Sequence, residues 1–155
     1  MPVPKSVVKF SKDGVTYTSN VDFASYSIVE LTRAALRDVG KYLTRMSNQK
    51  AQKLPGLKKS RRVRGSTSTF RYNVPWAKKG LPHLEVGVTH GTWYGVEQEM
   101  GTHRQPKREI LKKSAYENLA TIVEIESQYL TALKDEAKAL RLIKEKEYSG
   151  GEDSE

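Results

Sequence analysis

Apolar residues recur at steps of three and four along residues 22 to 46, which is the spacing of one face of an α-helix. Asp22 and Ser25 are alternative caps for its start, and we expect the helix to reach Met46 or beyond. Gly40 inside the pattern favours close packing against another backbone. The predicted buried stripe consists of Ile28, Leu31, Ala35, Val39, Leu43 and Met46. Four charged positions lie mostly off it, namely Glu30, Arg33, Arg37 and Lys41.

A second helical pattern runs from about Lys107 to Lys146 and is broken only by Glu126. Its apolar positions are Leu111, Ala115, Leu119, Ile122, Tyr129, Leu133, Ala137 and Leu140. A helix of that length would be about 60 Å long at 1.5 Å per residue, roughly twice the width of a small domain. We therefore expect the first half to pack on the protein's own sheet. The second half, with Leu133, Ala137 and Leu140, would form a subunit or partner interface.

Alternating apolar and polar residues predict four short strands. Two of them, Val7–Phe10 and Val15–Thr18, flank Asp13-Gly14 and are expected to form a hairpin. The other two, 69–74 and 84–89, are bounded by Pro75 and Pro82 and are expected to pair antiparallel. The predicted fold is an α+β single domain over residues 1–148. In it, a small antiparallel sheet packs against a long N-terminal helix and a long C-terminal helix, and an acidic tail at 149–155 is disordered.

The segment at about 47–68 is poor in apolar residues and rich in bases, so it is expected to be a long loop. Residues 39 to 84 contain twelve Lys or Arg and no Asp or Glu, within a chain of net charge +9. Such asymmetry favours a polyanionic or acidic partner. Two interpretations stay open: a docking or solvated arm, or contact with DNA phosphates. The bases at the centre of the loop are Lys58, Lys59, Arg61, Arg62 and Arg64.

The stretch from Trp93 to Ala115 reads as a short amphipathic helix, a sharp turn and the start of the long helix. Gly101-Thr102 forms the predicted turn, because the position after a helix often needs φ > 0, and Pro106 suits a first helical turn. Two interpretations of the apolar face remain, an ordinary core or a subunit contact. That face carries Trp93, Tyr94, Val96 and Met100.

Two short sequence patterns in this chain resemble, in their order and spacing, those of a known protein family. The first is Tyr94-x-x-Glu97-x-x-x-Gly101-Thr102, then Pro106 and a helix carrying Leu111 and Ala115. The second, upstream, is Leu54-Pro55-Gly56-Leu57-Lys58-Lys59-Ser60. Together they resemble the neck proteins of long-tailed bacteriophages, also called head–tail joining or tail completion proteins, over roughly residues 20 to 120. The chain departs from the family where Arg108-Glu109-Ile110-Leu111 replaces a Pro-Phe-Leu block.

The resemblance implies a structural virion protein that forms part of a homo-oligomeric ring joining the DNA-filled head to the tail. Its implied partners are other neck and tail proteins, for head closure, tail termination or the tail tube, and double-stranded DNA that passes through. The implied interface includes Trp93, Tyr94, Glu97, Met100, Gly101 and Thr102. The protein would be assembled in the host cytoplasm, which the absence of cysteine also favours. The alternative is a basic nucleic-acid-binding protein that uses the Lys41–Lys79 segment.

Candidate chemistry is sparse. The histidines His83, His90 and His103 form no His-Glu-x-x-His pattern, and no phosphate-binding Gly-rich loop or nucleophile elbow is present. A third alternative is a small metal-dependent nuclease built on Glu97, Glu99 and His103, but two carboxylates two positions apart diverge on a helix. No apolar run reaches 18 residues, and the first residues lack a signal-peptide core. We expect no enzymatic activity, no cofactor and no membrane partner.

Overall fold

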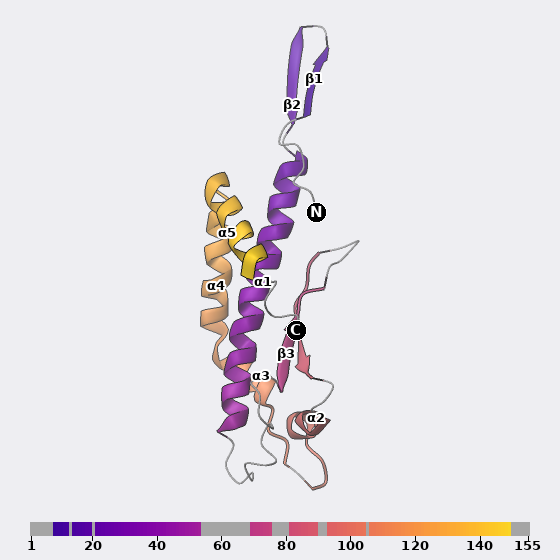
Figure 1. Cartoon of the computed structure of the whole chain (residues 1–155), viewed down its shortest axis with the longest axis vertical. Coiled ribbons are helices and arrows are strands. Elements are labelled where there is room, and N and C mark those ends of the chain that lie inside the picture. The colour runs from indigo at the N-terminus through magenta and orange to yellow at the C-terminus, as the bar shows by residue number, and fades with distance from the viewer. Residues whose placement is uncertain are drawn as a thin grey trace. The chain divides into compact units, whose positions relative to one another are not determined.

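The computed structural model describes residues 8–12, 14–19, 21–53, 69–75, 81–89, 93–104 and 106–149. Long helices and two short antiparallel sheets confirm the α+β class (Figure 1). The chain divides into two compact units: residues 1–34 with 127–155, and residues 35–126. The long helix α1 (Val21–Gln52) and the helix α4 (Leu119–Ala132) each contribute to both units.

The first unit contains a β-hairpin and helical segments. Strands β1 (Val8–Lys12) and β2 (Val15–Ser19) pair antiparallel with Lys12 opposite Val15, so only Asp13-Gly14 connects them. This confirms the predicted hairpin. Helix α5 (Glu136–Ser149) also belongs to this unit. The unit's buried apolar residues are Leu31, Ala34, Tyr129, Ala132, Ala139 and Ile143.

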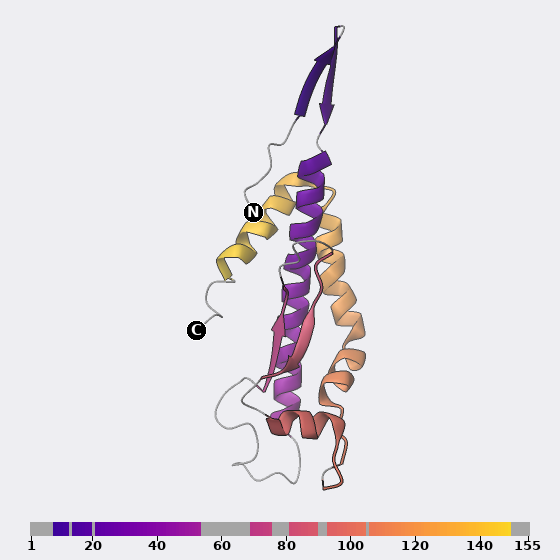
Figure 2. The same cartoon turned by 90° about the vertical axis from the view of Figure 1, so that its right-hand side faces the viewer.

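The second unit is built on the C-terminal part of α1, beside which strands β3 (Phe70–Asn73) and β4 (Glu85–Val88) lie (Figures 1 and 2). The strands pair antiparallel, as predicted. Gly40 of α1 sits against the sheet so closely that an added Cβ would lie 2.5 Å from the Tyr72 ring. Gly40 is thus closely packed, but the prediction of another backbone as its neighbour is wrong, because the nearest atoms belong to the side chains of Tyr72 and Leu84.

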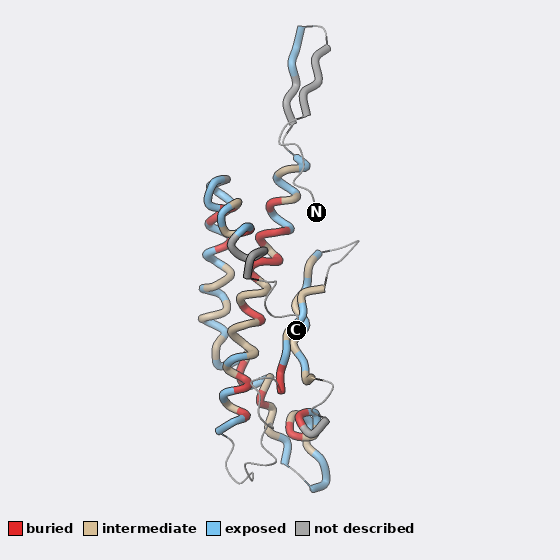
Figure 3. Tube along the Cα trace, in the orientation of Figure 1, coloured by how far each residue is buried: buried red, intermediate tan, exposed pale blue. Residues whose placement is uncertain are grey.

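A small apolar core joins α1, the sheet and helix α3 (Ile110–Glu117). Ala51, Phe70 and Ile110 are buried together, and Val88 and Leu111 pack against them. Figure 3 colours the chain by burial and shows buried stretches in red. Asn48 fixes the strand to the helix: its side-chain amide donates to Phe70 O at 3.2 Å and its side-chain oxygen accepts from Phe70 N at 3.1 Å. These two bonds satisfy the backbone N–H and C=O of Phe70, which is buried.

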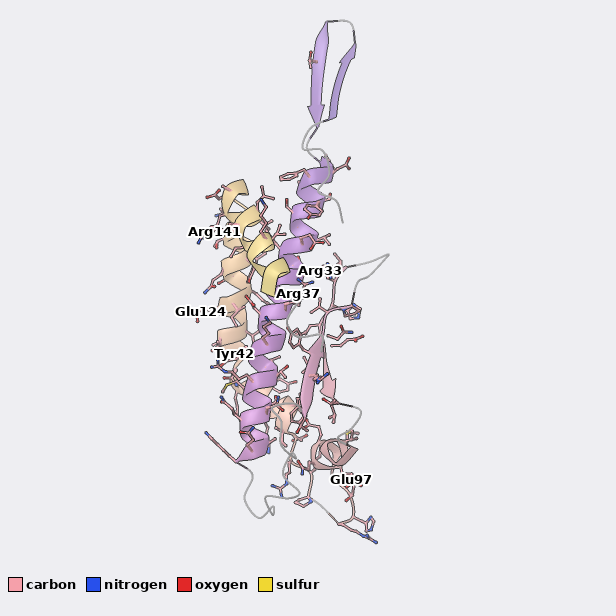
Figure 4. The ribbon with its side chains drawn as sticks, in the orientation of Figure 1. Arg33, Arg37, Tyr42, Glu97, Glu124 and Arg141 are labelled. Atoms are coloured by element: carbon pink, nitrogen blue, oxygen red, sulfur yellow. The ribbon has the colours of Figure 1, made fainter. Side chains whose placement is uncertain are left out.

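Helix α3 runs alongside the end of α1 and is tied to it by two polar contacts. The hydroxyl of Tyr42, which is labelled in Figure 4, donates to Asn118 Oδ1 at 2.8 Å, and Lys50 forms an ion pair with Glu117. Ile110 at the other end of α3 meets Ala51 in the core. The order of these contacts along the two helices makes α3 antiparallel to α1.

The prediction of one helix from about Lys107 to Lys146 is wrong, because three helices occupy that stretch: α3, α4 and α5. Asn118 ends α3, and its side chain donates to Ser114 O at 2.8 Å. Asp135 starts α5 by accepting from Ala137 N at 3.0 Å and Lys138 N at 3.3 Å. Such side-chain bonds to the backbone compete with continued helix, so the expected 60 Å rod is interrupted twice.

The buried faces also differ from the predicted stripes. In α3 the buried residues are Ile110 and Ser114, each one position before the predicted Leu111 and Ala115. Leu119 is exposed instead of packed on the sheet. In α1 Leu31, Ala35 and Val39 are buried as predicted, but Ile28 is exposed. Glu30 and Arg33, predicted to lie off the stripe, are buried and form an ion pair at 3.5 Å, which offsets part of their desolvation.

Candidate interaction module of α2 and α3

Helix α2 (Trp93–Met100) ends in a turn that only glycine fits well. Gly101 has φ +77°, the left-handed conformation that side chains disfavour, and its N–H donates to Glu97 O at 2.8 Å. A Cβ at Gly101 would also lie 2.8 Å from the backbone nitrogen of Lys107. The chain returning toward α3 therefore crosses directly over this glycine, which confirms the predicted turn.

The carboxylate of Glu99 holds the start of α3. Its oxygens accept from Leu111 N at 3.0 and 3.1 Å and from Lys112 N at 3.2 Å. These amides belong to the first turn of α3, where N–H groups lack helical partners and the helix dipole favours negative charge. The helix begins at Ile110 and not at the predicted Lys107, after Glu109 adopts φ +50°. Glu99 is thus a capping residue that the sequence patterns did not identify.

The module is also seated on the sheet. A Cβ added at Gly95 of α2 would lie 2.8 Å from a methyl carbon of Val88 and 3.0 Å from that of Thr69. Gln98 on the same helix is buried, and its carbonyl oxygen accepts from Arg108 N at 3.0 Å. Helix α2 is therefore fixed on one side by the sheet and on the other by the segment leading to α3. We call α2, the turn and α3 (residues 93–117) the α2–α3 module.

The opposite face of α2 points to solvent. Val96 is 51% exposed and Met100 is 70% exposed, whereas Glu97 is half-buried (Figure 4). The core interpretation is therefore wrong for Val96 and Met100. Thr102 in the following turn is exposed and accepts from Arg104 N at 3.3 Å. The side chains of Trp93 and Tyr94 lie outside the described residues.

Two lysines surround the left-handed Glu109 at the start of α3. Lys107 Nζ lies 2.9 Å and Lys112 Nζ lies 3.6 Å from Glu109 Oε1. The hydrogen bond and charge of Lys107, followed by the charge of Lys112, lower the pKa of the Glu109 carboxyl.

The proposed metal ligands are not brought together. Among the described residues, no group of three His, Asp or Glu side chains is arranged to hold a metal ion. Glu99 is engaged by the α3 amides, and His103 Nε2 accepts from Arg104 Nε at 3.1 Å. His83 lies elsewhere, 3.3 Å from Glu85, and His90 is outside the described residues.

The remaining predicted interface residues lie around the start of α5. Leu133 is exposed in the turn after α4, Ala137 is exposed on α5, and Leu140 is half-buried. The basic loop residues Lys58, Lys59, Arg61, Arg62 and Arg64 lie outside the described residues, as do residues 150–155 of the predicted acidic tail, whereas Ser149 ends α5. Of the described bases in the Lys41–Lys79 segment, Arg45, Lys53 and Arg71 are exposed.

Comparisons of the chain with protein-family models, with curated proteins and with solved structures find no match. Among the residues that the structure describes, no helix combines the length and apolar character needed to cross a bilayer.

Proposed function

We propose that the protein is a structural virion component of a tailed bacteriophage and forms part of the neck ring that joins the head to the tail. The observation that carries this proposal is where the motif lies. The residues that resemble the neck family, from Tyr94 through Glu97, Gly101 and Thr102 to Pro106, all belong to α2 and the connection to α3.

The α2–α3 module suits a structural contact better than chemistry. It is held by the sheet, by the Glu99 cap and by Gly101, so it presents α2 in one orientation. Its solvent side offers Met100 and Val96, and methionine is enriched at protein interfaces. A preorganised apolar face binds with little loss of conformational entropy. These features support a docking role, with other neck and tail proteins or a second subunit as partners.

A joining assay tests the proposal. Heads and tails from particles made without this chain are mixed with the purified protein, and joined particles are counted by electron microscopy. We expect the wild type to restore joining and Met100→Glu to abolish it, because a charge replaces an exposed apolar contact. Leu81→Glu is the matched control, since Leu81 is 81% exposed in the same unit and lies outside the module.

Two results would contradict the proposal. One is a wild-type protein that leaves heads and tails separate and is missing from completed particles. The other is an equal loss of joining in Met100→Glu and Leu81→Glu, which would show that the α2–α3 module does not form the contact. The thermal midpoint of both variants should match that of the wild type, because both side chains are exposed.

The alternative function is nucleic-acid binding through the Lys41–Lys79 segment. The observation that favours it is the exposure of Arg45, Lys53 and Arg71 in a stretch without acidic residues. Phosphate contacts make affinity fall steeply with salt. Two results together would favour this function over the neck ring. The protein would fail to join heads to tails, and it would shift duplex DNA in a gel in a salt-sensitive way that disappears on charge reversal of Lys58, Lys59 and Arg62.

A further inference from the structure

Helix α4 carries a second apolar face that points to solvent. Its positions follow alternating steps of four and three, the spacing by which a helix packs in a coiled coil. Four of them are apolar and between 42% and 66% exposed, and Glu126 occupies the middle position. We call this face the α4 seam: Leu119, Val123, Glu126, Leu130 and Leu133.

The α4 seam is distinct from the face that the protein buries for itself. Tyr129 and Ala132 are the buried residues of α4, and neither belongs to the seam. Helix geometry places positions four and three apart on one side, so the four seam residues from Leu119 to Leu130 share one face of α4, and Leu133 follows in the turn directly after the helix. A run of exposed leucine and valine side chains at this spacing is the kind of surface that a second helix covers.

Charge limits what that second helix can be. From Glu117 to Leu133 the chain contains three acidic residues, Glu117, Glu124 and Glu126, and no lysine or arginine. Glu126 is also the central position of the seam, seven residues from each end. Two α4 helices paired in parallel, or antiparallel about the centre of the seam, would place two Glu126 carboxylates opposite each other. Like charges in facing positions are unfavourable, so the seam disfavours a symmetric partner.

Helix α5 has the complementary character. Its middle part, residues 137–144, contains three exposed bases, Lys138, Arg141 and Lys144, whereas the acids of the helix, Glu136, Glu145 and Glu147, lie toward its ends. Ala137, directly before the first of these bases, is exposed, and Leu140, between Lys138 and Arg141, is half-buried. The middle of α5 therefore offers positive charge beside two apolar side chains, which is complementary in charge to the acidic α4 seam.

We propose that the α4 seam of one copy binds α5 of a second copy. The two faces differ, so each copy keeps one free seam and one free α5 after pairing. Such heterologous contacts repeat from copy to copy and give a ring when the rotation closes. The inference rests on the proposed neck ring and names the surfaces through which its subunits meet.

Charge exchange on the full-length chain tests the pairing. Molar mass is measured by light scattering over a range of protein concentrations up to millimolar. We expect the wild type to form oligomers, and Glu126→Lys or the pair Lys138→Glu with Lys144→Glu to weaken association at least tenfold. The three changes together in one chain should restore it, because the charges are exchanged across the contact. Gln128→Lys on α4 and Lys113→Glu on α3 are controls at exposed positions off both faces, and they should leave association unchanged.

Mixing experiments separate the two geometries. Glu126→Lys chains mixed with the Lys138→Glu, Lys144→Glu chains should associate more tightly than either alone. If wild type mixed with Glu126→Lys associates more tightly than either alone, the seams pair with each other and the proposal is overturned. A wild type that stays monomeric at millimolar concentration overturns it as well.

The outcome is independent of the joining assay. If the charge changes do not affect association but the protein still joins heads to tails, the proposed α4–α5 contact is refuted and the proposed neck function stands. If the protein forms rings that depend on these charges but is missing from completed particles, the α4–α5 contact stands and the proposed neck function is refuted. Circular dichroism of each variant verifies that its helices are intact.

Discussion

Replacing Gly40 by alanine sets two known effects against each other. Alanine is favoured over glycine inside a helix by up to about 1 kcal/mol. The new methyl carbon, however, would lie 2.5 and 2.7 Å from ring atoms of Tyr72 and 2.9 Å from a methyl carbon of Leu84. Overpacking of this kind costs about 1–3 kcal/mol. One of the ring atoms is Cγ, which is bonded to Cβ, so it moves away only if the Tyr72 side chain changes its χ1 rotamer or the strand shifts.

Overpacking should therefore prevail, and Gly40→Ala should lower the free energy of unfolding by about 1–2 kcal/mol. The thermal midpoint should fall by roughly 2–4 °C for each kcal/mol. Urea denaturation followed by circular dichroism measures the effect. In a Tyr72→Ala background the same substitution should cost clearly less, because neighbouring sites that share a contact are not additive.

Gly87 provides the control within the sheet. A Cβ at Gly87 of β4 would meet no atom within 4 Å, so Gly87→Ala should be neutral or stabilising by up to about 1 kcal/mol. If Gly40→Ala is as stable as the wild type, or if both glycine substitutions change stability equally, the close approach of α1 to β3 is refuted.

The other predictions concern the module and the core. Glu99→Ala should lower the free energy of unfolding, measured by urea denaturation, by about 0.5–2 kcal/mol, because the α3 amides lose their cap. Glu97→Ala is the control and should lower it less. Equal effects of the two substitutions would argue against capping by Glu99. Ile110→Ala should lower the free energy of unfolding by about 2–5 kcal/mol, because Ile110 is 3% exposed. Leu119→Ala should lower it by under about 1 kcal/mol, because Leu119 is exposed. A lower thermal midpoint for Leu119→Ala than for Ile110→Ala would contradict the observed burial.

Periodicity predicted the elements well where each had only one apolar face. The α1 helix, both strand pairs and α2 with its Gly101 turn follow directly from spacing and turn residues. On α4 two apolar stripes share one helix, the buried one with Tyr129 and Ala132 and the exposed seam. Spacing alone cannot tell which stripe faces the protein's own core, so the predicted stripe combined residues of both.

The breaks at Asn118 and Asp135 were missed for a different reason. Neither position carries glycine or proline, so the apolar pattern passes through both without a gap. What ends and starts these helices is side-chain bonding to the backbone, which depends on rotamer and partner. The Glu99 cap is similar, because its partner amides lie twelve and thirteen residues further along the chain, beyond the local spacing of a capping box.

The Glu99 cap has a consequence for how this region opens. Helices α2 and α3 have eight residues each, and isolated helices shorter than about 12–15 residues are marginal in water. Neither helix can persist without its surroundings, and the carboxylate of one satisfies the amides of the other. Local unfolding should therefore expose both helices in one event, with shared hydrogen-exchange protection. A partner that binds α2 would therefore also slow the local unfolding of α3, although the two helices are separate in the sequence.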